Sequence, residues 1–102
     1  MNNEAIKKIA DTYGYDAQSR QLIEEMAELT VAINKMWREG MKTDYFYSEL
    51  KKKDIAEEIA DVTIMLEQIK YLLQISDTDI DQIIEQKLNR QLERIGADER
   101  KS

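Results

Sequence analysis

Two short acidic strings in this chain repeat one pattern. Residues 24–33 read EEMAELTVAI, and residues 57–66, which lie 33 positions later, read EEIADVTIML. In each string two carboxylates stand three residues apart, Glu25 with Glu28 and Glu58 with Asp61. Residues three apart lie on the same side of a helix. The repeat therefore predicts two helices, each with a pair of carboxylates on one side.

Both carboxylate pairs border an apolar stripe, so packing the two stripes against each other brings the pairs together about an approximate two-fold axis. Like charges held close disfavour ionisation unless something neutralises them. Mg²⁺ neutralises them with oxygen ligands and keeps positions for waters and phosphates. An ordinary solvated helix flank explains either pair alone, but the duplicated pair in equal phase favours a metal. We therefore predict a Mg²⁺ site, with Mn²⁺ as a possible substitute, at Glu25, Glu28, Glu58 and Asp61.

The composition excludes several other kinds of chemistry. The 102 residues include no cysteine and no histidine, which removes disulfides, thiolate nucleophiles, Ser-His-Asp catalysis and histidine-containing metal sites. A ferritin-like di-iron site needs histidine as well and is excluded on the same ground. Asp and Glu number 21 against 15 Lys and Arg, a net charge of −6. We therefore expect neither nucleic acid nor a membrane surface as a partner.

The elements that must position the carboxylates are helices. Apolar residues recur every three or four positions, and the chain has no proline and only three glycines, which argues against a turn-rich β-fold. The sequence predicts one all-α domain over residues 1–102, a four-helix up-and-down bundle. The expected helices are 3–13 (cap Asn3, stop Gly14), 16–38 (stop Gly40), 48–73 (cap Ser48) and 78–95 (capping box Thr78 and Asp81, stop Gly96), with a loop over 40–49 and a frayed tail over about 97–102.

No apolar run is long enough to span a membrane, and the first residues do not resemble a signal peptide. A cytoplasmic protein is therefore expected. Two helices cannot bury these apolar stripes alone, so we also expect a homodimer or homotetramer in which bundles are completed between chains.

The carboxylate strings resemble a known family. Glu25-Met-Ala-Glu28 followed by Glu58-Ile-Ala-Asp61 is similar to the ExxE…ExxD signature of the MazG-like all-α nucleotide pyrophosphohydrolases, and the resemblance covers roughly residues 18–95. The flanking strings IEEMAEL and IAEEIADV and the late KLNRQLERI resemble that family too. The resemblance implies Mg²⁺ at the four carboxylates. It also implies hydrolysis of a nucleoside triphosphate between its α and β phosphates, which gives a monophosphate and pyrophosphate in a house-cleaning role.

Further site residues follow from the same resemblance. It makes Glu24 a candidate general base, against an equal interpretation as a solvated residue. It assigns Lys87 and Arg90 to the substrate phosphates, whereas Arg94 is better explained as a solvated basic flank. Gln21, one turn before Glu25, is a candidate contact to the base, the sugar or metal-bound waters. The remaining residues considered are Trp37, Tyr45, Phe46 and Tyr47, for which packing is favoured over base stacking, Asp54 as an outer-shell carboxylate, and Lys51, Lys52 and Lys53 as solvated side chains.

Other functions compatible with this pattern stay open. Phosphoribosyl-ATP pyrophosphohydrolase shares the family's fold and carboxylates. A non-catalytic helical interaction module would keep the apolar stripes without needing carboxylates in equal phase. A regulatory nucleotide sensor would bind its ligand without turnover. Metal binding separates the interaction module from the enzymes.

Overall fold

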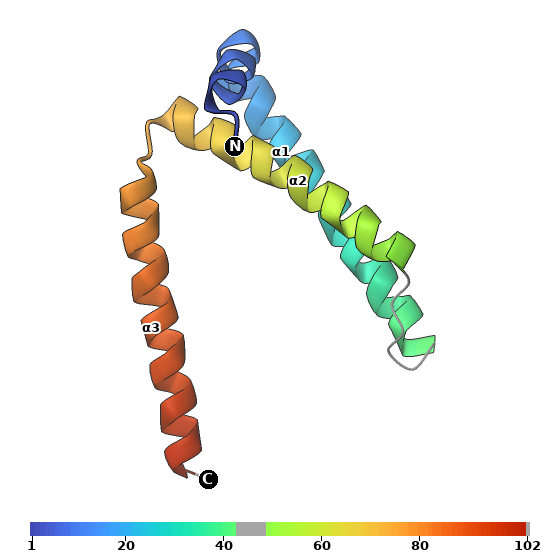
Figure 1. Cartoon of the computed structure of the whole chain (residues 1–102), viewed down its shortest axis with the longest axis vertical. Helices are drawn as coiled ribbons and strands as arrows, with labels where there is room; N and C mark the ends of the chain where they lie inside the picture. Colours follow the sequence, from blue (N-terminus) through green and yellow to red (C-terminus); the bar gives the residue numbers. More distant parts are fainter. Residues whose placement is uncertain (43–48, 102) are drawn as a thin grey trace.

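Three helices make up the chain in the computed structural model, which describes residues 1–42 and 49–101. They are α1 (Asn3–Lys42), α2 (Glu49–Leu73) and α3 (Asp77–Lys101), and the described residues include no strand (Figure 1). The predicted all-α class is confirmed. The residues predicted as the first two helices form the single element α1, which contains a non-helical break at Gly14.

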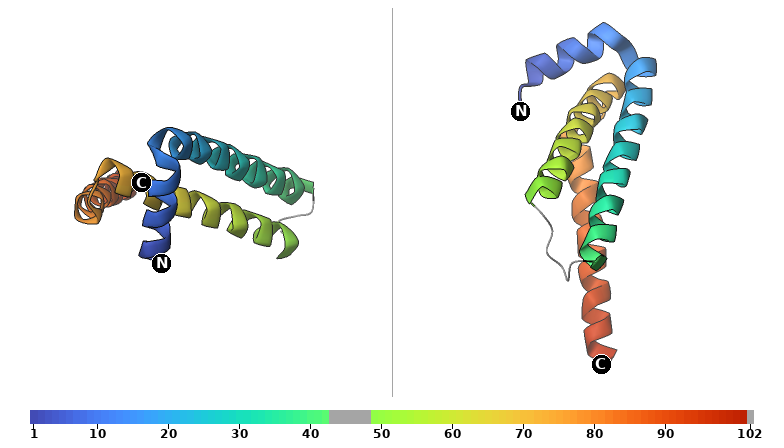
Figure 2. Two further views of the ribbon diagram at one scale, coloured as in Figure 1. Left: turned by 90° about the horizontal axis from the view of Figure 1, so that it is seen from above. Right: turned by 90° about the vertical axis from the view of Figure 1, so that its right-hand side faces the viewer.

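The join lies at Gly14, where the sequence predicts a helix stop. Gly14 has φ 82° and ψ 171°, which is far from helical geometry, yet helical residues continue on both sides. A residue without Cβ adopts a positive φ at little cost. The segment before Gly14 turns sharply away from the rest of α1 (Figure 2). Gly14 therefore interrupts the helix where the sequence predicts a stop, and the two helical segments of α1 meet there at an angle.

Helix ends differ from the predicted ones by a few residues. Asn2, and not Asn3, caps α1, since its Oδ1 accepts a hydrogen bond from the Ala5 amide at 3.1 Å. Ser76 caps α3 by accepting the Asp79 amide at 3.1 Å, so the predicted Thr78–Asp81 capping box is wrong. With Ser76 as the cap, Thr78 lies inside the first turn of the helix, and the Ile80 amide donates to the Ser76 carbonyl.

Two glycines fail to end their helices. Helix α1 continues through Gly40 to Lys42, and α3 continues through Gly96 to Lys101. The predicted tail from residue 97 is therefore helical through Lys101. A single glycine in a helix costs only about 1 kcal/mol relative to alanine, which good helix formers on both sides offset. The predicted cap Ser48 lies outside the described residues.

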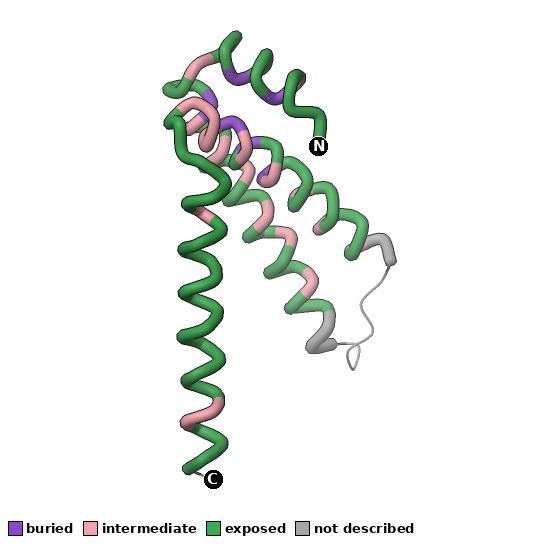
Figure 3. The backbone as a smooth tube through the Cα atoms, turned by 60° about the vertical axis from the view of Figure 1, so that its left-hand side comes forward, coloured by how far each residue is buried: buried purple, intermediate pink, exposed green. Residues whose placement is uncertain are grey.

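Helices α1 and α2 form an antiparallel hairpin, and this hairpin holds the core (Figures 1 and 2). Its buried apolar residues are Ile6, Ala10, Val62 and Met65. They gather near the bend of α1 (Figure 3). Much of the predicted stripe stays exposed in one chain, including Met26 at 48% and Ile59 at 50%. The hairpin therefore buries only part of its apolar surface.

A buried polar pair fixes the two helices of the hairpin against each other. Gln18 Nε2 on α1 donates a hydrogen bond to Gln68 Oε1 on α2 at 2.7 Å, and Gln68 is 1% exposed. Buried amides without partners cost free energy, so each side chain favours the register that supplies the other. The segment before the bend has its own link, because Tyr71 Oη donates to the Asp11 carboxylate at 2.9 Å.

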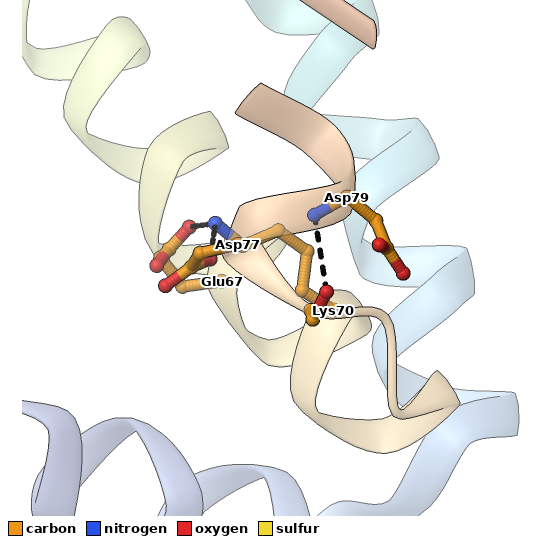
Figure 4. Close-up of polar contacts among 5 residues, drawn as sticks. Glu67, Lys70, Asp77 and Asp79 are labelled. Atoms are coloured by element: carbon orange, nitrogen blue, oxygen red, sulfur yellow. Dashed lines mark hydrogen bonds and ion pairs between the residues drawn. The ribbon is translucent and has the colours of Figure 1, made fainter. Parts of the chain in front are cut away.

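Helix α3 leaves the hairpin at a sharp turn. Gln74 adopts φ 57°, and Lys70 pairs with Asp77 at 2.8 Å and also with Glu67 (Figure 4). These hydrogen bonds, first to Asp77 and then to Glu67, raise the pKa of Lys70 above its ordinary value. Beyond the turn α3 extends away from α1 and α2, and none of residues Asp77–Lys101 is buried (Figures 1 and 3).

The apolar face of α3 is therefore uncovered in the single chain. Its large apolar side chains are each about half exposed or more: Ile83, Ile84, Leu88, Leu92 and Ile95. A contiguous exposed apolar stripe of this kind is typical of a surface that takes part in an interaction.

Candidate metal centre

Three carboxylates from the two hairpin helices meet at one point. Glu25 on α1 and Glu58 and Asp61 on α2 each offer an oxygen, and these oxygens lie within 4.8 Å of one another. Glu25 and Glu58 are half-buried, whereas Asp61 is exposed. The three residues come from both acidic strings, as the equal spacing predicts. The cluster has the oxygen donors that a hard divalent cation requires.

Glu28, the fourth predicted ligand, lies beside this cluster. The negative charge of Glu25 raises the pKa of Glu28 most, followed by the charge of Glu58. Although Glu28 is exposed, some loss of solvation, a hydrogen bond with Glu25 and the charge of Asp61 act in the same direction. A carboxyl group with a raised pKa is one whose ionised form is disfavoured by its neighbours. The fold therefore brings all four predicted carboxylates into one region.

Two carboxylate oxygens of these residues are shielded from solvent and have no hydrogen-bond partner. Among the described residues, Glu25 Oε2 and Glu58 Oε2 are buried and accept no hydrogen bond. Native proteins rarely leave a buried acceptor unsatisfied, and a charged one costs more than a neutral one. A divalent cation between these oxygens would satisfy both. The oxygen donors therefore suit Mg²⁺ or Mn²⁺, and a bound cation would also give the two unpartnered oxygens a partner.

The repeat in the sequence is also a repeat in the structure. Glu25 and Glu58, which carry the two unpartnered oxygens, are equivalent positions of the acidic strings. A threonine stands five residues after each of these glutamates. Thr30 donates a hydrogen bond to the Met26 carbonyl at 2.9 Å, and Thr63 donates one to the Ile59 carbonyl at 2.7 Å. The two helices therefore present equivalent residues in equal helical phase.

Gln21 orients the first carboxylate. Its Nε2 donates a hydrogen bond to Glu25 Oε1 at 2.8 Å, from one turn earlier on α1. The sequence places Gln21 on the same line as Glu25 and predicts a contact to substrate or metal waters; the observed partner is Glu25 itself. Such outer-shell bonds fix the direction of a ligating oxygen and tune its affinity. Here the bond engages Oε1, whereas Oε2 of the same group is buried and accepts no hydrogen bond from the described residues.

A pocket of about 390 Å³ adjoins the cluster between α1 and α2. Glu28 and Glu58 line it at one end, and Lys35 and Lys51 line it two helical turns further along. Its lining is completed by the small or apolar Ala27, Val31 and Ala32 and by the acidic Asp54 and Glu57. Asp54, predicted as an outer-shell carboxylate, thus lines the pocket but does not join the oxygen cluster.

Sequence reasoning missed the two lysines of this pocket. It predicts Lys51 as solvated, whereas its side chain is 29% exposed and pairs with Glu39 at 3.5 Å. Lys35 is exposed and was not identified from the sequence. The sequence contains a signal for both lysines. Lys35 stands seven residues after Glu28, and Lys51 stands seven residues before Glu58. On antiparallel helices these two offsets run in the same direction along the hairpin, by about two turns.

The remaining predicted site residues lie away from the carboxylates or outside the described chain. Glu24 is exposed and belongs neither to the cluster nor to the pocket lining. Lys87, Arg90 and Arg94 are exposed on α3, which extends away from the hairpin, so one chain does not bring them to the cluster (Figure 1).

Of the four aromatic residues considered from the sequence, the structure describes Trp37. Trp37 is 59% exposed, so the prediction that it packs in the core is wrong for this chain. It borders a shallow depression of about 330 Å³ with Val31, Asn34 and Arg38. Tyr45, Phe46 and Tyr47 lie outside the described residues.

Comparison of the chain with protein-family models, with curated proteins and with solved structures gave no match. None of the helices within residues 1–42 and 49–101 combines the length and the apolar character that crossing a membrane requires.

Proposed function

We propose that this chain is a Mg²⁺-dependent nucleotide pyrophosphohydrolase of the MazG-like kind. The single observation that supports it most is the pair of buried, unpartnered oxygens of Glu25 and Glu58 within a four-carboxylate region. Acidic clusters on helix flanks are common without a metal, but buried carboxylate oxygens without a partner are not. The family signature carried by the same four residues links that metal site to nucleotide chemistry.

In this proposal Glu25, Glu28, Glu58 and Asp61 hold the ion. Bound Mg²⁺ screens the phosphate charges, polarises a phosphoryl oxygen and lowers the pKa of a bound water. The hairpin keeps the two acidic strings in equal phase, and Gln21 holds Glu25 in its orientation through the 2.8 Å hydrogen bond. The substrate is a nucleoside triphosphate cut between its α and β phosphates.

A second copy of the chain completes the site in this proposal. The hairpin leaves Met26 and Ile59 about half exposed, and α3 leaves its whole apolar face uncovered. Packing α3 of one copy on the hairpin of another would cover both surfaces and bring Lys87 and Arg90 to the carboxylates. The same packing would enclose Glu24, which a general base beside the cluster needs. Size-exclusion chromatography with light scattering is expected to show a dimer or a tetramer.

The uncovered face of α3 also supports a second candidate function, a helical interaction module without catalysis. Its apolar side chains are exposed whether or not the carboxylates bind an ion. The two functions differ in metal binding. An interaction module would take up neither Mg²⁺ nor Mn²⁺ at the hairpin, whereas the pyrophosphohydrolase binds one of them through Glu58.

A nucleotide panel tests the enzymatic proposal. The purified chain is incubated with ribo- and deoxyribonucleoside triphosphates and Mg²⁺, and pyrophosphate and orthophosphate are measured separately. The expected result is pyrophosphate with monophosphate from at least one substrate, no release in EDTA, and none from Glu58→Gln. Glu85→Gln, which removes the same charge from exposed α3, is the matched control and is expected to keep full activity. Release of orthophosphate and diphosphate would place the cleavage at another bond and contradict the proposal.

A further inference from the structure

The turn between α2 and α3 is short and has a defined geometry. Only residues 74–76 join the two helices. The Ile75 amide donates to the Lys70 carbonyl at 2.9 Å, and the Gln74 amide donates to the Tyr71 carbonyl at 3.1 Å. With Gln74 at φ 57°, these two bonds form the Schellman motif that ends many helices. A residue other than glycine adopts this conformation only at a cost, so the contacts around the turn must hold it there.

An ion pair ties the start of α3 to the end of α2. Lys70 pairs with Asp77 Oδ1, at the first residue of α3, at 2.8 Å, and it also pairs with Glu67 (Figure 4). Ser76 accepts the Asp79 amide at 3.1 Å, which caps α3 directly at the turn. Turns of two to five residues join antiparallel helices in other αα-hairpins. Here the contacts direct α3 away from the hairpin of its own chain (Figure 1).

The hairpin has an apolar face that its own α3 does not cover. Met26 and Ile33 on α1 and their equivalents Ile59 and Leu66 on α2 are each between 44% and 50% exposed. Each stands one position after a residue that is buried or half-buried at the contact of the two helices. On antiparallel helices, positions one step after the contact point to the same side of the pair. The four side chains therefore share one face of the hairpin.

The apolar stripe of α3 matches this face in length. The stripe runs from Ile80 to Ile95, about 22 Å at 1.5 Å per residue, and no residue of α3 is buried. On α1 the exposed apolar residues run from Ile23 to Trp37, about 21 Å on the same scale. One helix of this length covers the face from end to end.

The charge beside the stripe suits a hairpin of this sequence. Three basic residues of α3 stand three or four positions apart: Lys87, Arg90 and Arg94. The two acidic strings of the hairpin hold six carboxylates and no basic residue. Opposite charges on two surfaces favour their association and fix its orientation. The basic side of α3 is therefore expected to lie toward the acidic strings.

From the fixed turn and the two uncovered faces we infer that α3 is an exchanged element. The α3 of each chain packs on the hairpin of a second copy, which returns its own α3 in the same way. Two copies related by a two-fold axis cover both hairpin faces and both stripes, so the contact is closed. Short hinges under strain favour such an exchange. The inference rests on the second copy in the proposed function and adds that the turn at residues 74–76 enforces the exchange.

Lengthening the turn tests this inference. A Gly-Ser-Gly-Ser segment between Ile75 and Ser76 keeps the Schellman motif and the Ser76 cap but separates Asp77 from Lys70. The connection then has about seven residues, within the usual range for neighbouring helices of a bundle. We expect α3 to fold back on its own hairpin, so that the mass from size-exclusion chromatography with light scattering falls to about half. The control carries the same segment after Ser102 and is expected to keep the wild-type mass.

A second variant tests the packing face independently of the turn. Leu88→Lys places a charge in the middle of the α3 stripe, where Leu88 is 53% exposed in the single chain. The fold of one chain therefore tolerates the change, but the contact with a second copy does not. The mass is expected to fall to about half of the wild-type value. Gln86→Lys adds the same charge on the exposed polar face of α3 and is expected to keep the wild-type mass.

The contrary outcomes are separate from those of the proposed enzymatic function. A monomeric wild type, or a wild-type mass for the lengthened chain or for Leu88→Lys, would overturn the exchange. Loss of helix content by circular dichroism in the lengthened chain would overturn it too, because a freed α3 is expected to find its own hairpin. Mn²⁺ binding by the wild type in any of these cases leaves the metal centre standing. Halved masses without Mn²⁺ binding would support the exchange and contradict the pyrophosphohydrolase.

Discussion

The hydrogen bond between Gln21 and Glu25 engages only one of the two carboxylate oxygens of Glu25. Gln21 Nε2 donates to Oε1 at 2.8 Å, whereas Oε2 of the same group is buried without a partner among the described residues. A carboxylate fixed through one oxygen has less freedom to turn the other toward solvent. The arrangement is suited to presenting Oε2 to a cation.

Replacing Gln21 by Ala is expected to lower the affinity for Mn²⁺ by roughly 10- to 100-fold, the range found when an outer-shell partner of a metal ligand is removed. The four carboxylates stay in place, so binding weakens without being abolished. Isothermal titration with Gln86→Ala as the control, an exposed Gln on the polar face of α3, measures the change. Equal affinities in wild type and Gln21→Ala would show that the bond does not support the metal site.

The pH dependence of the metal-free protein follows from Glu28. Its neighbours, chiefly Glu25 and then Glu58, raise the pKa of Glu28 above the ordinary 4.5. The native state therefore binds this proton more readily than the unfolded state does. The stability that protonation contributes is fully present below 4.5 and is lost as the pH rises through the raised pKa.

The corresponding measurement compares wild type with Glu28→Gln, which stays neutral at every pH. In EDTA, thermal melts from pH 4.5 to 8 are expected to show the variant gaining stability relative to the wild type as the pH rises. Mg²⁺ affinity of the wild type is expected to fall as the pH is lowered through the same raised pKa, because protons compete for the ligand. Melting temperatures that run parallel across this range would contradict the mutual repulsion of the carboxylates.

The carboxylate cluster was more predictable from the sequence than the helix ends were. Spacing of three residues and an identical helical phase decide which side of a helix Glu25 and Glu58 occupy, and those rules hold in any helix. Gln21 follows from the same periodicity. The cap of α3 does not, because Ser76 and Thr78 offer the same kind of side-chain acceptor, and the turn at Gln74 decides between them.

Long-range pairings were the part that local pattern could not predict. Gln18 and Gln68 are both polar and lie 50 residues apart, and nothing in either segment indicates that they form a buried pair. The lysines of the pocket were missed for a related reason. Their equal spacing from Glu28 and Glu58 can be read from the sequence, but the pocket that they line together is seen only in the assembled hairpin.

The buried pair itself is open to test. Gln68→Ala leaves Gln18 without its partner and opens a small cavity, so the free energy of unfolding is expected to fall by roughly 1–3 kcal/mol. Gln86→Ala makes the same substitution on the exposed polar face of α3 and is expected to have little effect. Urea unfolding followed by circular dichroism measures both. Similar midpoints for the two variants would mean that the 2.7 Å hydrogen bond does not stabilise the hairpin.

The central claim is that the hairpin tolerates repulsion among its carboxylates in order to hold a divalent cation. Glu58→Gln tests this claim, because the amide keeps the size of the side chain, removes one charge and can donate to a neighbouring carboxylate. Without metal the variant is expected to be as stable as the wild type, or more stable by roughly 1 kcal/mol. Mg²⁺ is expected to stabilise the wild type by mass action, about 2.7 kcal/mol at one hundred times its dissociation constant, and the variant much less.

Thermal melts of wild type, Glu58→Gln and the charge-matched Glu85→Gln, first in EDTA and then with Mg²⁺, are the most direct measurement. The account predicts that Glu58→Gln melts at or above the wild-type temperature in EDTA and gains little from Mg²⁺, while Glu85→Gln gains as much as the wild type. A Glu58→Gln protein that melts several degrees lower in EDTA, with a Mg²⁺ shift equal to that of the wild type, would contradict it and assign the carboxylates a structural role.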